Sequence, residues 1–213
     1  APFTRAGTTV RPPPPQAKAE LPGDSGDGWL QQYRVAATDG LVATPVHLSD
    51  IEAATLPCAG GVTAWNALLE AGIGPGDVVV TQGTGGGVSL FAVQFAHALG
   101  AEVILTSSSD EKLKIGSALG AAHLINYLDT PDWEHEVKRI TGGRGADLVV
   151  DLGGPETLAH SVRAARMGGT VAVIGVLTGG VRRRADTGCR LDAQQHSGHR
   201  HHRRQRAELR RTV

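Results

Sequence analysis

The stretch Gly76-Asp-Val-Val-Val-Thr-Gln-Gly-Thr-Gly-Gly-Gly-Val-Ser-Leu-Phe91 is the most informative part of this 213-residue chain. Its β-branched segment, 78–81, predicts a strand, its glycines predict a tight turn, and the apolar pattern that continues to Ala98 predicts a helix. A glycine turn lets the backbone approach a pyrophosphate, and a helix N-terminus supplies unpaired N–H groups and a partial positive charge. The stretch therefore predicts a phosphate-binding turn, a signal that is weak alone and strong inside a repeating strand–helix series.

Such a series runs through residues 51–178. Its strands consist almost entirely of Val, Ile and Leu, which is typical of a parallel sheet covered by helices on both faces. Right-handed crossovers then give a doubly wound α/β fold of the nucleotide-binding kind. We expect strands at 78–82, 102–106, 123–126, 147–151 and 170–175, and helices at 51–71 (in two parts, broken near Pro57), 87–99, 109–119, 132–141 and 155–166.

Charge is divided unevenly along the chain, although the totals of 21 basic and 21 acidic residues balance. Residues 1–180 carry 11 Lys and Arg against 18 acids, a net of −7, whereas residues 181–213 carry 10 Arg against 3 acids, a net of +7. Because the end of the chain also lacks apolar periodicity, we expect residues 179–213 to be a disordered Arg/His-rich tail. Non-specific nucleic-acid or partner binding through this tail is an alternative function. Specific nucleic-acid binding and an evolved metal site are not expected there.

The N-terminal region has a different character. Residues 1–20 contain a run of prolines and predict an extended segment. Residues 28–36 and 41–47 predict two short strands, which cannot form a stable domain alone, so residues 21–50 are interpreted as the end of another domain. The chain begins with Ala1 rather than Met, so we expect a fragment. Two widely separated cysteines and no long apolar run favour a reducing, cytoplasmic location and no membrane span.

Several motifs occur in an order and spacing that resemble the medium-chain dehydrogenase/reductase superfamily, in particular its zinc-type alcohol dehydrogenase and quinone oxidoreductase-like members. The resemblance covers roughly residues 21–178. It rests on the glycine turn together with Glu52-Ala-Ala-Thr-Leu-Pro-Cys-Ala-Gly60, Thr63-Ala-Trp-Asn-Ala-Leu68, Ser107-Ser-Ser-Asp-Glu-Lys112, Leu119-Gly-Ala-Ala-His-Leu-Ile-Asn-Tyr127 and Val173-Ile-Gly175.

The resemblance implies a Rossmann NAD(P)-binding domain at 51–178 and a remnant of a GroES-like β domain at 21–50. It also implies hydride transfer between NAD(P)H and a small-molecule alcohol, aldehyde or quinone. After Thr178 the sequence departs from the family pattern, which would continue with a sixth strand, and it looks like coding read out of frame. We therefore expect a truncated chain that does not form the family's usual homo-oligomer. A catalytically inactive dinucleotide-binding fragment is the main alternative.

The predicted cofactor site combines the glycine turn, which has one glycine more than the family pattern, with the end of the second strand. That end reads Thr106-Ser-Ser-Ser109, without the carboxylate that NAD-binding folds place there for the ribose 2′-hydroxyl. We therefore favour NADP over NAD. The resemblance adds three positions from other segments, namely Thr63, Tyr127 and Gly175. The predicted cofactor-binding residues are Thr63, Gly83, Thr84, Gly85, Gly86, Gly87, Val88, Ser107, Ser108, Lys112, Tyr127 and Gly175.

Metal and catalytic residues are not predicted. Cys58 matches a zinc-ligand position of the zinc alcohol dehydrogenases, but a lone cysteine with no Cys or His partner nearby cannot hold zinc. We interpret Cys58 as a small buried residue and expect no zinc in this chain. Most of the family's catalytic positions belong to the part of the substrate domain that the sequence does not match, so the catalytic acid is unknown.

Overall fold

The computed structural model describes residues 28–36, 38, 41–57, 60–83, 85–175 and 178. The chain divides into two compact units, one of residues 1–45 and 191–213 and the other of residues 46–190. Thr84, Cys58, Cys189, the proline-rich segment and the tail after Thr178 lie outside the described residues, so the expectations for them remain untested.

The two strands predicted before residue 48 are wrong. The described residues of 28–36 and 41–47 form neither α-helix nor strand. Their contacts are local, such as the Gln31 N–H donating to the Trp29 carbonyl at 2.8 Å and the Arg34 guanidinium 4.7 Å from the Trp29 ring. A strand needs a neighbouring strand for its backbone groups, and the described residues of this unit supply none. The assignment of residues 21–50 to a GroES-like remnant stays a prediction.

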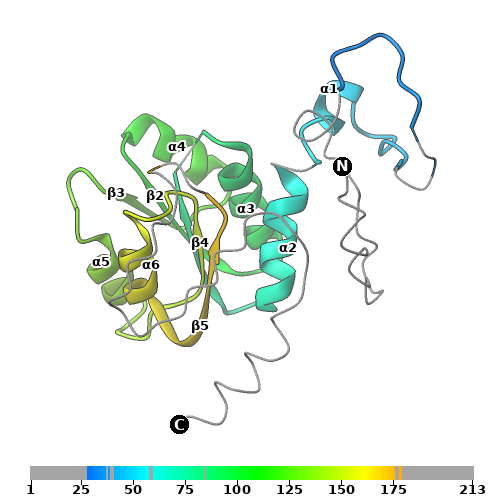
Figure 1. The fold of residues 1–213 in the computed structure, drawn as a ribbon. Coiled ribbons are helices and arrows are strands. Elements are labelled where there is room, and N and C mark those ends of the chain that lie inside the picture. The colour runs from blue at the N-terminus through cyan, green and yellow to red at the C-terminus, as the bar shows by residue number, and fades with distance from the viewer. Residues whose placement is uncertain are drawn as a thin grey trace, which may run out of the picture. The chain divides into compact units, whose positions relative to one another are not determined.

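The second unit is a parallel five-stranded sheet with the order β3-β2-β1-β4-β5, as predicted for a doubly wound fold. The strands are β1 (Val78–Gln82), β2 (Glu102–Ser107), β3 (His123–Asn126), β4 (Ala146–Asp151) and β5 (Ala165–Val173). The helices are α1 (Asp50–Ala53), α2 (Gly61–Ala71), α3 (Gly87–Ala98), α4 (Asp110–Ala118), α5 (Trp133–Ile140) and α6 (Leu158–Ala164). Figure 1 shows α2 and α3 on one side of the sheet and α5 and α6 on the other.

Both faces of the sheet are buried in apolar clusters. Val79 of β1 packs in the cluster that includes residues of α2, α3 and α4, whereas Val78 and Val80 pack in the cluster that includes residues of α5 and α6. Alternate side chains of one strand point to opposite faces, so a strand buried on both sides is mostly apolar. The Val-rich sequence of β1 follows from this, and its five residues are all buried.

Helix ends follow the predicted signals closely. Ser49 forms a capping box with Glu52, and the Ser109 side chain caps α4 by accepting from the Lys112 N–H. Gly100 and Gly120 follow α3 and α4 with positive φ, the left-handed conformation that glycine adopts without strain. The expected break near Pro57 separates α1 from α2.

The boundary between the last helix and the last strand differs from the prediction. Residues 155–157 form a turn, α6 ends at Ala164, and β5 already begins at Ala165 with an irregular register against β4. Thr157 explains the late start of the helix, because its hydroxyl donates to the Asp151 carboxylate at 2.9 Å. Strand β5 ends at Val173 because the N–H groups of Ile174 and Gly175 both donate to the Asp151 carbonyl. Among the described residues, no helix is long and apolar enough to span a bilayer.

Candidate cofactor site

The glycine turn follows β1 directly, at the carboxyl edge of the sheet. Gly83 has φ +72° and Gly85 has φ +128°, so a side chain at either position would be strained. The Gly83 N–H donates to the Thr106 carbonyl at 2.8 Å and joins the turn to the end of β2. No heavy atom of the described residues lies within 4 Å of a Cβ built on Gly83, so the positive φ is the reason for this glycine.

Helix α3 presents its N-terminus at this turn. Its N-cap is Gly86, which supplies no capping side chain, and the first bond of the helix runs from the Leu90 N–H to the Gly86 carbonyl at 3.2 Å. The N–H groups of Gly87 and Val88 precede that bond and therefore have no partner within the helix. With the partial positive charge of a twelve-residue helix, they form a site suited to a phosphate.

The end of β2 and the start of α4 lie beside the turn. Ser107 is buried and its carbonyl accepts from the Tyr127 N–H at 3.0 Å, while Ser108 and Lys112 are exposed. The Lys112 Cε lies 4.0 Å from the position of a Cβ on Gly85. Lys112 therefore extends over the glycine turn, and its ammonium group is available to an anion bound there.

Asp110 places a carboxylate near the end of β2, directly after the serine run on which the preference for NADP rests. It occupies the first position of α4, and its Oδ1 accepts from the Asn126 amide at 2.9 Å. The Asn126 Oδ1 in turn accepts from the Leu128 N–H at 3.1 Å, which fixes the orientation of the amide. Asp110 is thus held against the end of β3. A sequence signal existed, because Asp110 directly follows the serine run.

Thr63 and Gly175 lie in other parts of the unit. Thr63 is a half-buried residue of α2. Gly175 follows β5, where its N–H donates to the Asp151 carbonyl at 3.1 Å and an added Cβ would overlap the Leu152 carbonyl. Close backbone packing therefore explains the glycine at 175 without a cofactor. The structure groups Gly83, Gly85–Val88, Ser107, Ser108, Lys112 and Tyr127, while roles for Thr63 and Gly175 stay predictions.

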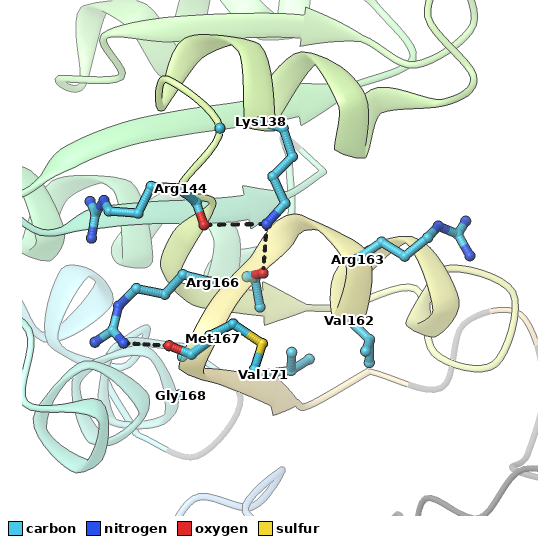
Figure 2. A pocket seen from close by; sticks show the side chains of 11 residues that line it. Lys138, Arg144, Val162, Arg163, Arg166, Met167, Gly168 and Val171 are labelled. Carbon is cyan, nitrogen blue, oxygen red and sulfur yellow. Dashed lines mark hydrogen bonds between the residues drawn. The ribbon is translucent and has the colours of Figure 1, made fainter. Parts of the chain in front are cut away.

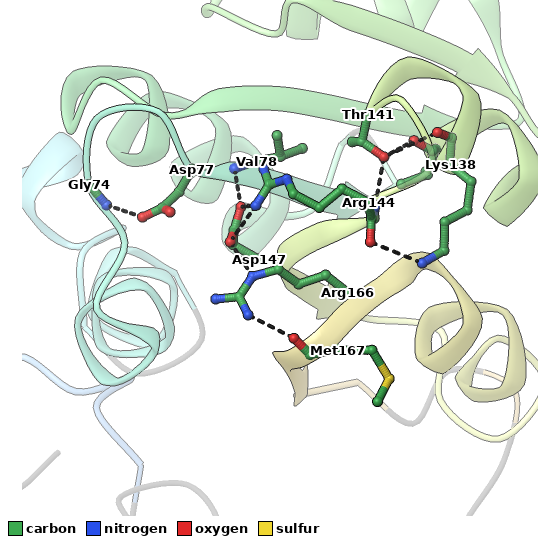
Figure 3. A network of polar contacts seen from close by, with 11 residues as sticks. Gly74, Asp77, Val78, Lys138, Thr141, Arg144, Asp147, Arg166 and Met167 are labelled. Atoms are coloured by element: carbon green, nitrogen blue, oxygen red, sulfur yellow. Dashed lines mark hydrogen bonds and ion pairs between the residues drawn. The ribbon is translucent and has the colours of Figure 1, made fainter.

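The opposite, amino edge of the sheet holds a cationic network. Asp147 at the start of β4 is 6% exposed and binds Arg144 at 2.9 Å, Arg166 at 2.5 Å and the Val78 N–H at 2.8 Å, as Figure 3 shows. Burial alone would raise the pKa of the Asp147 carboxyl, but the Val78 N–H and the two guanidinium groups outweigh burial and lower it. Asp147 therefore stays ionised and joins the starts of β1, β4 and β5.

A cavity of about 520 Å³ lies next to this network and is lined by Lys138, Arg144, Arg163 and Arg166 together with apolar and glycine residues of α6 and β5. Figure 2 shows Arg144 and Arg166 on one side of it and Arg163 on the other, with Lys138 between them. Lys138 Nζ donates to the carbonyls of Arg144 and Ala165. These cations have structural partners, and none of the residues that line the cavity is a predicted cofactor-binding residue, so the cavity is distinct from the predicted site.

Comparison with known proteins defines the family. Residues 87–194, which make up about half of the chain, match the family model for zinc-binding dehydrogenases. The chain belongs to the zinc-binding dehydrogenase family. The match continues past Thr178, where we expected the resemblance to end. A zinc-type alcohol dehydrogenase-like protein of Schizosaccharomyces pombe is 47% identical over 156 residues, which is 72% of this chain and 44% of the relative.

Solved structures agree with this membership. A crystal structure described as an alcohol dehydrogenase from Sinorhizobium meliloti 1021 has a TM-score of 0.73 and 47% identity, covering 81% of this chain and 50% of that one. An NAD-dependent alcohol dehydrogenase has a TM-score of 0.66 and 40% identity over 72% of this chain and 44% of that one. A mycobacterial protein solved with NADPH has a TM-score of 0.58 and 30% identity over 65% of this chain and 42% of that one. This member of the family thus spans about half the length of its relatives.

Zinc does not fit the described residues of this family member. One group among them has suitable ligand types, namely Asp132, Glu134 and His160. The Glu134 carboxylate, 2% exposed, is already bound by Arg163 at 2.7 Å and by His160 at 2.6 Å, and the guanidinium charge opposes a metal cation. Burial would raise the pKa of Glu134, but the bonds from His160, its own backbone and Arg163 outweigh it and the pKa is lowered. The group serves as a clamp between α5 and α6.

Proposed function

We propose that this chain is the cofactor-binding part of an NADP-preferring oxidoreductase. The observation that carries the proposal is the position of Lys112 over the glycine turn, beside Ser107 and Ser108 at the end of β2. An adenosine ribose bound at the carboxyl edge of such a sheet reaches the end of the second strand. A 2′-phosphate there would meet an ammonium and hydroxyl groups.

The binding roles follow from the geometry of each element. The N–H groups of Gly87 and Val88 would hold the pyrophosphate, and Gly83 and Gly85 give the turn the conformation that leads into α3. Gly86 belongs to the same turn, and Thr84, which lies outside the described residues, is proposed for the site from its place in the sequence alone. Tyr127, 39% exposed after β3, would lie at the adenosine side, which its N–H bond to the end of β2 supports. The Asp110 carboxylate near this site favours NAD, but its bond to Asn126 directs it toward β3.

The proposed reaction is hydride transfer between the cofactor and an alcohol, aldehyde or quinone. In the direction of alcohol oxidation, a bound oxidised cofactor would accept the hydride of the carbinol carbon, and the hydroxyl proton would pass to a base or to water. The cofactor supplies this chemistry, while the protein supplies orientation and electrostatics. The names of the related alcohol dehydrogenases support the substrate class. A cytoplasmic location and the absence of bound zinc belong to the same proposal.

A second candidate is a dinucleotide-binding fragment without turnover. It is favoured by the length of the match, because the chain spans 44% of the S. pombe relative and 50% of the S. meliloti chain. Catalysis requires substrate, proton donor and nicotinamide to be held together, and a misplacement of about 1 Å can cost about a hundredfold in rate. Cofactor titration and a turnover assay separate the two candidates.

Calorimetric titration with NADPH and NADH tests the cofactor proposal. A charge-assisted contact to the 2′-phosphate contributes about 1.5–3 kcal/mol, so we expect NADPH to bind about tenfold to a hundredfold more tightly than NADH. Gly85→Val is the companion variant, because a β-branched residue at φ +128° distorts the turn and should weaken both cofactors. Equal or reversed affinities of the wild-type chain would overturn the NADP preference.

A further inference from the structure

A buried polar network joins the ends of β1 and β4, between the glycine turn and the loop that leads into α6. Gln82 is the last residue of β1 and is 6% exposed, and Asp151 is the last residue of β4 and is fully buried. The strands are parallel neighbours with Thr81 opposite Val150, so these two polar residues come next in register. In the order β3-β2-β1-β4-β5 the chain reverses direction across the sheet between β1 and β4, where such folds bind their ligands.

The Gln82 carboxamide has a partner on every side. Its Oε1 accepts from the N–H groups of Leu152 and Gly153, both at 3.2 Å. Its Nε2 donates to the Ser161 hydroxyl at 2.6 Å and reaches the Asp151 carboxylate at 3.4 Å. A flipped amide would set its NH₂ group against two backbone donors, so the network allows one orientation. A side chain attached directly before Gly83 thus fixes the first residues of the β4–α6 loop.

Asp151 fixes the rest of that loop. Its carboxylate accepts from the Ser161 hydroxyl at 2.6 Å, from the Gly154 N–H at 2.8 Å and from the Thr157 hydroxyl at 2.9 Å. Its carbonyl accepts from Ile174 and Gly175, so the same residue also holds the segment after β5. Low local dielectric strengthens each of these bonds and makes an unpaired member costly. The network therefore has one rigid arrangement.

We propose that Gln82 is a positioning residue of the cofactor site, whose carboxamide sets the glycine turn against the β4–α6 loop. This inference rests on the proposed function, because the turn is the proposed pyrophosphate site. Gln82 does not need to touch the cofactor. It determines where the backbone N–H groups after it stand. Ser107 at the end of β2 and Lys112 on α4 lie on the other side of β1 from the β4–α6 loop, and the Gly83 N–H bond to Thr106 joins that side to the turn.

The test compares Gln82→Met, which keeps the side-chain length and removes all four polar contacts, with Gln94→Met, an exposed position on α3. NADPH and 2′-AMP are titrated into each variant. We expect Gln82→Met to raise the NADPH dissociation constant at least about tenfold and to leave that of 2′-AMP within about twofold. Gln94→Met should change neither. A general loss of structure would weaken both ligands equally, and that result, or unchanged NADPH binding, would overturn the proposal.

Amide hydrogen exchange without ligand separates this inference from the proposed function. In Gln82→Met the amides of residues 83–88 and 152–157 should exchange faster, while those of α4 should not. If the wild-type chain bound no cofactor, the proposed function would fail, but the exchange experiment could still be read. Unchanged amide exchange of the turn in Gln82→Met would then overturn the positioning role on its own. Should Gln82→Met not fold, Ser161→Ala, which removes one link, is measured in the same way, with a smaller shift in the same direction expected.

Discussion

The Lys112→Asp variant tests the basis of cofactor preference. Lys112 is an exposed residue whose Cε lies 4.0 Å from the site of a Cβ on Gly85, so its charge stands at the edge of the proposed phosphate site. Its contact with a 2′-phosphate would contribute about 1.5–3 kcal/mol. Because Lys112 is exposed to solvent, we expect its contribution toward the lower end of this range, and the carboxylate introduced by the substitution would also repel the 2′-phosphate. We expect the NADPH dissociation constant to rise about tenfold to a hundredfold.

The matched control is Lys114→Asp, an exposed lysine of the same helix with the same charge change. Two residues along an α-helix the side chain points to a different face, so Lys114→Asp should change NADPH binding by no more than about a factor of two. NADH has no 2′-phosphate, and Lys112→Asp should leave its affinity nearly unchanged. The measurement is calorimetry at low salt, since screening would reduce the difference. Equal losses for both cofactors, or equal losses in both variants, would refute the reasoning.

Four further outcomes are expected. Asp147→Asn should lower the free energy of unfolding by about 1–3 kcal/mol, measured by urea denaturation, because Arg144 and Arg166 lose a charged partner; an unchanged midpoint would contradict this. The pKa values of Asp147 and Glu134 are lowered in the folded state. The stability that these two carboxylates contribute is therefore complete above their unfolded-state pKa values, which are about 4, and is lost as the pH falls through their folded-state pKa values. Stability should therefore drop below about pH 4, and less so in Asp147→Asn. The chain alone should not oxidise NADPH above background with aldehydes or quinones, and robust turnover would favour the enzyme over the fragment. Finally, deletion of residues 181–213 should leave NADPH affinity unchanged, because all proposed site residues lie between 63 and 175.

The sequence predicted the sheet because local signals and burial agree there. Strands β1 and β3 were predicted with their observed limits. Strand β1 is a Val-rich segment between Gly76 and Gly83, and β3 is a short segment that follows the helix end at Gly120. The glycine turn and the Ser109 cap were predictable for the same reason. The strand pattern of 28–36 was misleading, because alternation of side chains forms a strand only where a partner strand is present.

Contacts between distant residues could not be predicted. Gln82 and Asp151 are 69 residues apart, and nothing in either local sequence indicates that they pair. The approach of Lys112 to Gly85 and the bond from Asn126 to Asp110 arise from the way α4 packs beside β2 and β3. The late start of α6 likewise depends on the bond from Thr157 to Asp151, which is a tertiary contact.

The central claim is that a dinucleotide binds at the carboxyl edge of the sheet, and chemical-shift mapping tests it most directly. Backbone amide shifts of the ¹⁵N-labelled chain are followed during titration with NADPH. The largest changes should occur at Gly83, Gly85–Val88, Ser107 and Lys112, with little change at Arg166 beside the basic cavity. Shifts concentrated around that cavity, or none at saturating cofactor, would contradict the account.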